Sequence, residues 1–196
     1  MKRIPRFIFA LGGAIMFSLQ GCSEPIRYEK YSSRDAEINL SMDYISGWLY
    51  SESRGSAGSY AQVIFYEPKR EDKNLKAGIV VTVQDEARVQ PGSFDISAFA
   101  DAFLERRGKF KDMEVLSRSQ GKLFGEESIT LELTYKSLDK LQSADAALVP
   151  VKEKIVVLHR GGKFYSFRYI NTDREFNRFA RAFSRILKTV EFKAQQ

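Results

Sequence analysis

The chain has 196 residues, a formal net charge of +6, one histidine and one cysteine. A single cysteine excludes a disulfide within the chain. Three of the cations precede the cysteine and no acid does, so the remainder carries only +3, and this weak charge argues against nucleic acid as a partner.

The first 21 residues have the pattern of a secretory signal peptide. Lys2, Arg3 and Arg6 form a basic start, residues 7–19 are mostly apolar, and small residues lie near the cleavage point. An apolar run of about 13 residues is shorter than the roughly 20 that a membrane-spanning helix needs. We therefore expect residues 1–21 to be a cleaved signal rather than a permanent anchor.

The next motif, Leu19-Gln20-Gly21-Cys22, resembles the lipobox of bacterial lipoproteins. The resemblance implies that the bond before Cys22 is cut and that this cysteine receives acyl chains, two or more of which hold a protein firmly on a membrane. Ser23, where inner-membrane lipoproteins carry Asp, implies sorting to the outer membrane of a Gram-negative cell, on its periplasmic side. The alternative is an ordinary secretory signal followed by a coincidental cysteine.

A short tether and one globular domain are expected after the signal. Residues 23–37 are mostly polar and charged, with Pro25 near their start, which is typical of a flexible linker. We therefore assign residues 22–37 to the lipidated cysteine and its tether, and residues 38–196 to a single domain. A domain of about 155 residues can bury roughly two thirds of its unfolded surface in one core.

The first half of the domain is predicted to form four strands. Alternation of apolar and polar residues marks 38–42 and 48–50, and denser apolar runs mark 61–66 and 78–83. The serines and glycines of residues 51–59 favour a mobile loop or hairpin between the second strand and the third.

One amphipathic helix of about three turns should follow. The apolar residues that recur at helical spacing are Ile96, Phe99, Ala100, Phe103 and Leu104. Either Asp95 or Ser93 can cap the start of this helix, and Gly108 can close its end.

Strand patterns return after the helix. They cover residues 113–117, 122–124, 128–135, 154–159 and 163–170. The last two are expected to pair across Gly161-Gly162, because two glycines supply the positive φ angles that a tight turn needs. Residues 137–150 interrupt the pattern and are predicted to form a short helix or an ordered loop.

A second helix is predicted from about Asp173 to Val190. Thr172 and Glu175 have the spacing of a capping box. Seven apolar residues fall within about 120° on a helical wheel, which predicts a wide face that packs on the sheet. They are Phe176, Phe179, Ala180, Phe183, Ile186, Leu187 and Val190.

This order of elements favours an α+β fold with a largely antiparallel sheet covered by helices. Three stretches carry a family resemblance: the Tyr44-Ile45-Ser46-Gly47-Trp48 turn after an early strand, the hairpin through Gly161-Gly162, and the closing Phe183-Ser184-Arg185-Ile186-Leu187 with Val190 and Phe192. The chain resembles the PsbP-like proteins, which include photosystem II protein PsbP and bacterial lipoproteins. The resemblance implies an α/β/α sandwich with two main helices, but no particular activity, because such folds serve unrelated functions.

No constellation of catalytic residues is recognisable. His159 lies in a strand pattern, and catalysis or zinc binding would need a partner set that includes no second histidine and no available cysteine. Gly55-Ser56-Ala57-Gly58 lacks the spacing of a nucleophile elbow. The acidic pairs Glu71-Asp72, Asp85-Glu86 and Glu126-Glu127 lack the pattern of a calcium loop. We therefore expect no enzyme activity, no cofactor and no metal site.

Five cations form the surface feature that we expect to contact a partner. They are spaced four, three, four and three residues apart, so they share one face of the closing helix, opposite its apolar stripe. We call them the basic ridge: Arg174, Arg178, Arg181, Arg185 and Lys188. The ridge could meet lipid phosphates or an acidic partner, and the alternative is a solvated face that only keeps the protein soluble.

Together these features predict a lipid-anchored lipoprotein of the cell envelope that acts as a non-enzymatic accessory or protein-binding module. The expected partners are the membrane, through acyl chains on Cys22, and an envelope protein, for which a weak interface would suffice because attachment raises the local concentration. One alternative is a carrier or sensor of a small apolar or lipid-like ligand in an aromatic-lined cleft. An unrecognised hydrolase is a third, although no nucleophile or base can be named for it.

Overall fold

The computed structural model describes residues 25–68, 77–89, 95–138 and 147–193. The predicted signal, the Leu19-Gln20-Gly21-Cys22 motif, Ser23, Ser93, the Glu71-Asp72 pair and the centre of 137–150 lie outside these ranges. Within them, no helix is long and apolar enough to cross a membrane.

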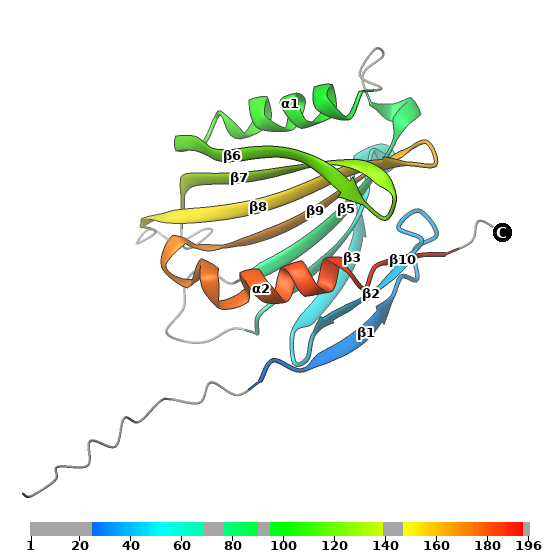
Figure 1. The fold of residues 1–196 in the computed structure, drawn as a ribbon, viewed down its shortest axis with the longest axis horizontal. Coiled ribbons are helices and arrows are strands. Elements are labelled where there is room, and N and C mark those ends of the chain that lie inside the picture. The colour runs from blue at the N-terminus through cyan, green and yellow to red at the C-terminus, as the bar shows by residue number, and fades with distance from the viewer. Residues whose placement is uncertain (1–24, 69–76, 90–94, 139–146, 194–196) are drawn as a thin grey trace, which may run out of the picture.

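Two antiparallel sheets form the scaffold (Figure 1). The larger has seven strands in the order β3-β4-β5-β9-β8-β7-β6, and the smaller has three in the order β1-β2-β10. The strands are β1 (Tyr28–Ser32), β2 (Leu40–Ile45), β3 (Leu49–Arg54), β4 (Ala61–Tyr66), β5 (Gly78–Asp85), β6 (Lys111–Leu123), β7 (Glu126–Leu138), β8 (Leu148–Arg160), β9 (Lys163–Thr172) and β10 (Glu191–Phe192). Three short 3-10 helices join them: η1 (Ser56–Gly58), η2 (Glu86–Arg88) and η3 (Asp173–Glu175).

Two helices, α1 (Ile96–Arg107) and α2 (Phe176–Leu187), cover opposite faces of the seven-stranded sheet (Figure 1). Strand β9 shows why, because successive side chains of a strand point to opposite faces. Phe164 belongs to the core under α1, whereas Tyr165 and Phe167 belong to the core under α2. The α+β fold predicted from the sequence, with helices on both sides of an antiparallel sheet, is confirmed.

The small sheet packs beside α2 and enlarges the core on that side. Tyr31, Leu40 and Met42 are at most 2% exposed. The predicted apolar stripe of α2 is confirmed with one change: Ala180 is only half-buried, and Ala182 is buried in addition.

Several local predictions are also confirmed. The carboxylate of Asp95 caps α1 by accepting the Ser97 N–H at 2.8 Å, and Gly108 follows its last residue. Gly161 and Gly162 have φ angles of 57° and 71° in the two-residue turn between β8 and β9. Gly47, at φ 79°, makes the turn before Trp48.

Three predictions for strands were wrong in extent. Residues 28–32, expected to be tether, form β1 because Tyr31 is buried and β2 offers an edge for pairing. Strand β3 runs through the first part of the expected loop 51–59, paired with β4. Residues 111–123 form one strand instead of two, since an edge strand exposed on both faces shows no apolar alternation.

Two predictions around the second helix were also wrong. Thr172 and Glu175 form no capping box. Instead the buried amide of Asn171 donates to the Glu175 carbonyl at 3.2 Å, and the Tyr169 hydroxyl donates to the Phe176 carbonyl at 2.8 Å. At the ends of 137–150, the described residues continue β7 and begin β8 rather than forming a helix.

Candidate functional site: a basic groove beside α2

The structure exposes all five residues of the basic ridge but does not keep them together. Arg174 lies in η3, before α2 begins. The side chain of Arg178 is engaged in ion pairs instead: its guanidinium lies 3.3 Å from a carboxylate oxygen of Glu67 and 3.7 Å from a carboxylate oxygen of Glu175. The ridge therefore divides, and only its last three members share a cavity.

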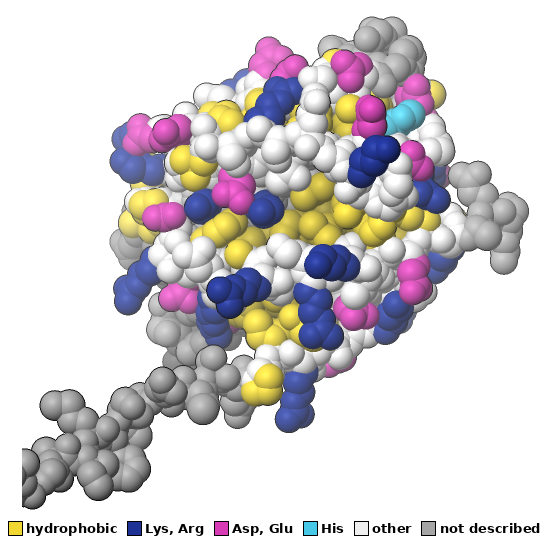
Figure 2. Space-filling model, viewed as in Figure 1, with side chains coloured by type: hydrophobic (Ala, Val, Ile, Leu, Met, Phe, Trp, Pro, Cys, Tyr) yellow, Lys and Arg dark blue, Asp and Glu magenta, His cyan; other side chains and the backbone are white. Residues whose placement is uncertain are grey.

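That cavity, which we call the basic groove, lies between α2 and strands β7 and β8 and has a volume of about 460 Å³. Figure 2 shows Lys and Arg side chains gathered around this part of the surface. The groove contains five cations and one acid. Its lining residues are Glu132, Lys152, Lys154, Phe176, Asn177, Ala180, Arg181, Ser184, Arg185 and Lys188.

Two of these cations come from β8 and were not among the sequence candidates. Lys152 and Lys154 are two residues apart, so both point to the α2 side of the sheet. Lys154 pairs across the strands with Glu132, with Nζ 3.0 Å from Oε1. Lys152 lies over the ring of Phe176, 5.1 Å from its centroid. The alternation Lys-Glu-Lys was visible in the sequence, but nothing there showed that it would face α2.

Most cations of the groove have no acidic partner among the described residues. Within the described part of the chain, Lys152, Arg181, Arg185 and Lys188 form no ion pair with an acid. The two guanidiniums can each present a fork of N–H donors to phosphate or carboxylate oxygens. Phe176 and Ala180 supply an apolar floor. The groove is therefore suited to an anionic group attached to something larger.

The groove lies next to the strand that leads towards Cys22. The guanidinium carbon of Arg185 is 4.0 Å from the centroid of the Tyr28 ring, at the start of β1. Cys22 is six residues before Tyr28 in the sequence, and six residues reach at most about 20 Å when fully extended. Any attachment at Cys22 would thus keep the groove near the point of attachment.

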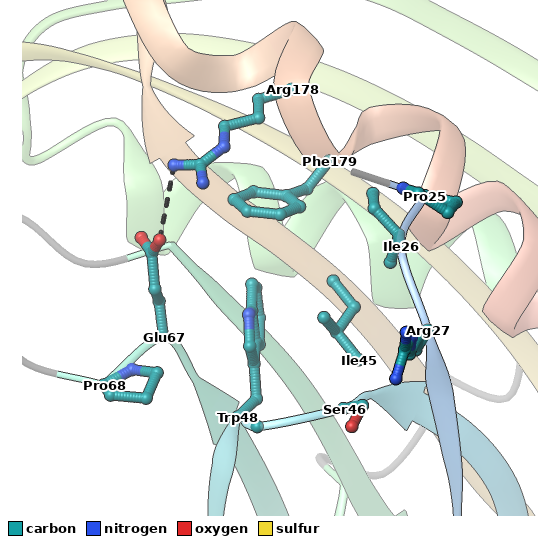
Figure 3. Close-up of a pocket in the computed structure, with 11 residues that line it drawn as sticks. Pro25, Ile26, Arg27, Ile45, Ser46, Trp48, Glu67, Pro68, Arg178 and Phe179 are labelled. Atoms are coloured by element: carbon teal, nitrogen blue, oxygen red, sulfur yellow. Dashed lines mark hydrogen bonds and ion pairs between the residues drawn. The ribbon is translucent and has the colours of Figure 1, made fainter. Parts of the chain in front are cut away.

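A second cavity, which we call the aromatic cleft, opens beside Arg178 and Phe179, near the start of α2 (Figure 3). It has a volume of about 960 Å³ and is lined by Pro25, Ile26, Arg27, Ile45, Ser46, Gly47, Trp48, Glu67, Pro68, Arg178 and Phe179. The rings of Trp48 and Phe179 meet edge to face with centroids 5.2 Å apart. The ion pair between Arg178 and Glu67 forms one wall.

The opposite side of the sheet holds a buried charge cluster that the sequence did not reveal. Glu153, with no exposed surface, accepts a hydrogen bond from Arg168 Nε at 2.6 Å and one from the Tyr135 hydroxyl at 3.1 Å. Arg107, at the end of α1, places Nε 3.3 Å from the same carboxylate. Burial lowers the pKa of Arg107 and raises the pKa of Tyr135 above its usual value. The Phe103 ring covers both guanidiniums, which indicates a structural role.

His159 has one carboxylate neighbour at hydrogen-bond distance among the described residues. Its Nε2 lies 2.9 Å from an Oε2 of Glu86 in η2. Asp95, Glu126 and Glu127 line a small pocket of about 250 Å³ beside it. Among the described residues, no group of three or more His, Cys, Asp or Glu side chains is arranged to hold a metal ion. The expectations of no metal and no cofactor stay predictions.

Comparison with known proteins bears on the fold alone. No protein-family model matches the chain, and no curated protein sequence does. The structure of the cyanobacterial PsbP protein (CyanoP) from Synechocystis is similar, with a TM-score of 0.56 and 14% identity, over 93% of this chain and 98% of that one.

Two further structures share the architecture. A Pseudomonas aeruginosa protein described as a putative regulator has a TM-score of 0.54 and 12% identity, over 86% of this chain and 99% of its own. The Ran-binding protein Mog1p of Saccharomyces cerevisiae has a TM-score of 0.52 and 10% identity, over 86% and 96%. The resemblance noted in the sequence is therefore confirmed at the level of structure: the chain has the PsbP-like fold.

Proposed function

We propose that the protein is a lipid-anchored, non-enzymatic accessory module of the cell envelope, which binds a protein partner while its basic groove rests on a membrane. Acyl chains on Cys22 would hold it on the periplasmic side of the outer membrane. The observation that carries the proposal is the contact between Arg185 and Tyr28, which places the groove beside the strand leading to the anchor.

The short distance between the groove and the strand that leads to Cys22 favours lipid phosphates as the ligand of the groove. The potential of an anionic membrane falls off over about 8–10 Å at physiological salt, so only cations near the anchor would feel it. Each such cation contributes on the order of 1 kcal/mol of attraction. Acyl chains and a basic patch together bind a membrane more firmly than either does alone. The groove would then determine which face of the domain contacts the membrane.

A protein-binding role is supported by the kind of surface present and by the fold. The described residues offer no catalytic set, whereas cations and strand edges suit recognition. One similar structure is that of a Ran-binding protein, so the fold can serve protein recognition. No partner is carried over from that similarity, because folds are shared by proteins with unrelated tasks.

The anchor is tested by Cys22→Ala. The variant should carry no acyl chains, so it should be released or mislocalised from the outer-membrane fraction. A Ser23→Ala variant is the control and should remain in the membrane. Unchanged fractionation of the Cys22→Ala protein would refute the lipoprotein assignment.

The aromatic cleft favours a second candidate function, that of a carrier of a small apolar or lipid-like ligand. Its Trp48 and Phe179 rings and its size are those of a small-molecule site. Mass spectrometry of the protein purified from its own cells under native conditions should then reveal a retained molecule, and Phe179→Ala should lose it. Repeated spectra without a ligand would count against the carrier.

A further inference from the structure

We propose that the basic groove selects a phosphate monoester, the terminal phosphate of a membrane lipid, over the phosphodiester that joins a phospholipid to a larger headgroup. This inference rests on the proposed function for the membrane itself, and it names the lipid chemistry that the groove recognises. It can fail while the groove still meets an anionic membrane, because a general attraction between charges needs no such preference.

The groove carries more positive charge than one phosphodiester can balance. Its five cations are opposed by a single acid, Glu132, whose Oε1 lies 3.0 Å from Nζ of Lys154. In the described part of the chain, the cations of the groove without an acidic partner are Lys152, Arg181, Arg185 and Lys188. A phosphodiester has one negative charge, whereas a phosphate monoester carries about −1.5 to −2 at pH 7. The monoester therefore balances more of the charge in the groove.

The cations lie on both walls of the groove. Strand β8 supplies Lys152 and Lys154 to one wall, and α2 with the residue after it supplies Arg181, Arg185 and Lys188 to the other. A group bound between the walls can accept hydrogen bonds from both. A phosphate monoester offers three free oxygens for such bonds, whereas a diester offers two. The enclosed shape thus favours the monoester as well.

Arg181 and Arg185 provide donors of the right geometry for phosphate oxygens. They are four residues apart, so they are neighbours on one face of α2, and both are exposed. Each planar guanidinium can donate two parallel N–H groups to a pair of phosphate oxygens. Two adjacent guanidiniums are used more fully by three free oxygens than by two.

Two of the unpaired cations are held over aromatic rings. Nζ of Lys152 lies 5.1 Å from the centroid of the Phe176 ring, and the guanidinium carbon of Arg185 lies 4.0 Å from that of Tyr28. Contact with a ring restrains a cation but does not cancel its charge. Side chains that are already restrained lose less conformational freedom when a ligand binds. The groove is therefore suited to one specific anion rather than to a diffuse layer of charge.

The bound phosphate is the group whose charge should respond to pH. The second pKa of a phosphate monoester is about 6, and nearby cations favour the charged form, so binding should lower this pKa. The charged side chains that face the phosphate are the five cations and Glu132, and no histidine is among the described residues that line the groove. Binding of a monoester should therefore strengthen as the pH rises from about 5 to 7, whereas binding of a diester should not change.

Vesicle sedimentation tests the preference. The mature chain carrying Cys22→Ala is mixed with phosphatidylcholine vesicles that contain either phosphatidic acid, a monoester, or enough phosphatidylglycerol, a diester, to give the same zeta potential. Binding to phosphatidic acid should be at least about tenfold tighter. Equal binding at equal potential would overturn this inference and would leave the attraction to anionic membranes intact, so the two proposals can fail separately.

Variants of the groove test where the preference arises. Arg181→Ala with Arg185→Ala should reduce the preference to less than about threefold, and Arg174→Ala, outside the groove, should retain it. Glu132→Gln should strengthen binding to phosphatidic acid by about threefold, because it frees Lys154 from its ion pair. If the double alanine variant does not fold, Arg181→Lys with Arg185→Lys keeps the charge and should still lower the preference. A preference that is unchanged in the folded double variant would contradict the inference.

Soluble monoesters separate the lipid from the phosphate group alone. Phosphorus NMR follows the second ionisation of dihexanoyl phosphatidic acid, kept below the concentration at which it forms micelles, and of glycerol 3-phosphate. The wild-type protein should lower the pKa of the lipid phosphate, and the double alanine variant should not. The effect on glycerol 3-phosphate should be smaller, because that molecule has no chain to contact Phe176 and Ala180 on the apolar floor. An equal effect would overturn the lipid as the ligand, and an unchanged pKa for both would overturn the monoester site.

Discussion

The two faces of the large sheet differ in how their charged side chains are placed: they are buried and paired on one face, and exposed and mostly unpaired on the other. Under α1, one carboxylate and two guanidiniums are buried together, and Glu153 has contacts with Arg107, Arg168 and Tyr135. Beside α2, four cations of the basic groove lie at the surface with no acid paired to them within the described residues. Neighbouring residues of β8 serve both arrangements, since Glu153 is flanked by Lys152 and Lys154.

The difference shows which charges stabilise the fold and which remain available. A buried charge is tolerated only when its partners are present, because its transfer from water costs several kcal/mol. Solvated cations impose no such demand and can bind an external anion. The predictions below separate the two cases by unfolding free energy, from the largest expected effect to the smallest.

Glu153→Ala should cause the largest loss, about 3–5 kcal/mol in the free energy of unfolding, because it leaves two buried guanidiniums without their carboxylate. Urea denaturation followed by circular dichroism measures the loss. Glu132→Ala, which breaks the surface pair with Lys154, is the matched control and should cost at most about 1 kcal/mol. Similar losses for the two variants would show that the α1 cluster is not a structural requirement.

Asn171→Ala should cost about 1–3 kcal/mol, because the start of α2 would lose a buried hydrogen-bond donor to the Glu175 carbonyl. The same urea titration applies. Asn177→Ala, on the exposed surface of α2, should change stability by no more than about 0.5 kcal/mol. If Asn171→Ala behaved like this control, the polar contacts at residues 169–176 would not be what fixes the helix.

Asp35 gives a smaller effect that depends on pH. The hydrogen bond from Arg54 lowers the pKa of this carboxyl below its ordinary value of about 4. A lowered pKa contributes stability that is present above the ordinary value and is lost as pH falls through the lowered one. Wild type should therefore exceed Asp35→Asn in stability at pH 6, and the difference should disappear in strong acid. A difference that did not change with pH would rule out this linkage.

Arg181→Ala with Arg185→Ala should have the smallest effect on folding, within about 0.5 kcal/mol, because both side chains are exposed and neither has an acidic partner among the described residues. Thermal unfolding monitored by circular dichroism is sufficient. A loss above about 2 kcal/mol would mean that the groove serves the fold, as the α1 cluster does.

How much of this could be predicted depended on the range of the contacts. The caps and turns at Asp95 and Gly161-Gly162 are local, and the sequence predicted them. The stripe of α2 was predicted because its apolar period is unmistakable. The burial of Glu153 could not be, because Arg107 lies 46 residues away and meets it only after α1 packs on the sheet. The same is true of Lys152 and Lys154, whose place in the groove depends on α2 lying over β8.

The measurement that tests the central claim is sedimentation of the unacylated mature chain, carrying Cys22→Ala, with vesicles of phosphatidylcholine alone or mixed equally with phosphatidylglycerol. Binding should require phosphatidylglycerol, and Arg181→Ala with Arg185→Ala should weaken it about 30-fold, which corresponds to about 1 kcal/mol for each cation. Arg174→Ala, outside the groove, should have less than about a threefold effect. Equal binding to neutral vesicles, or no loss in the double variant, would contradict the claim that the groove meets an anionic membrane.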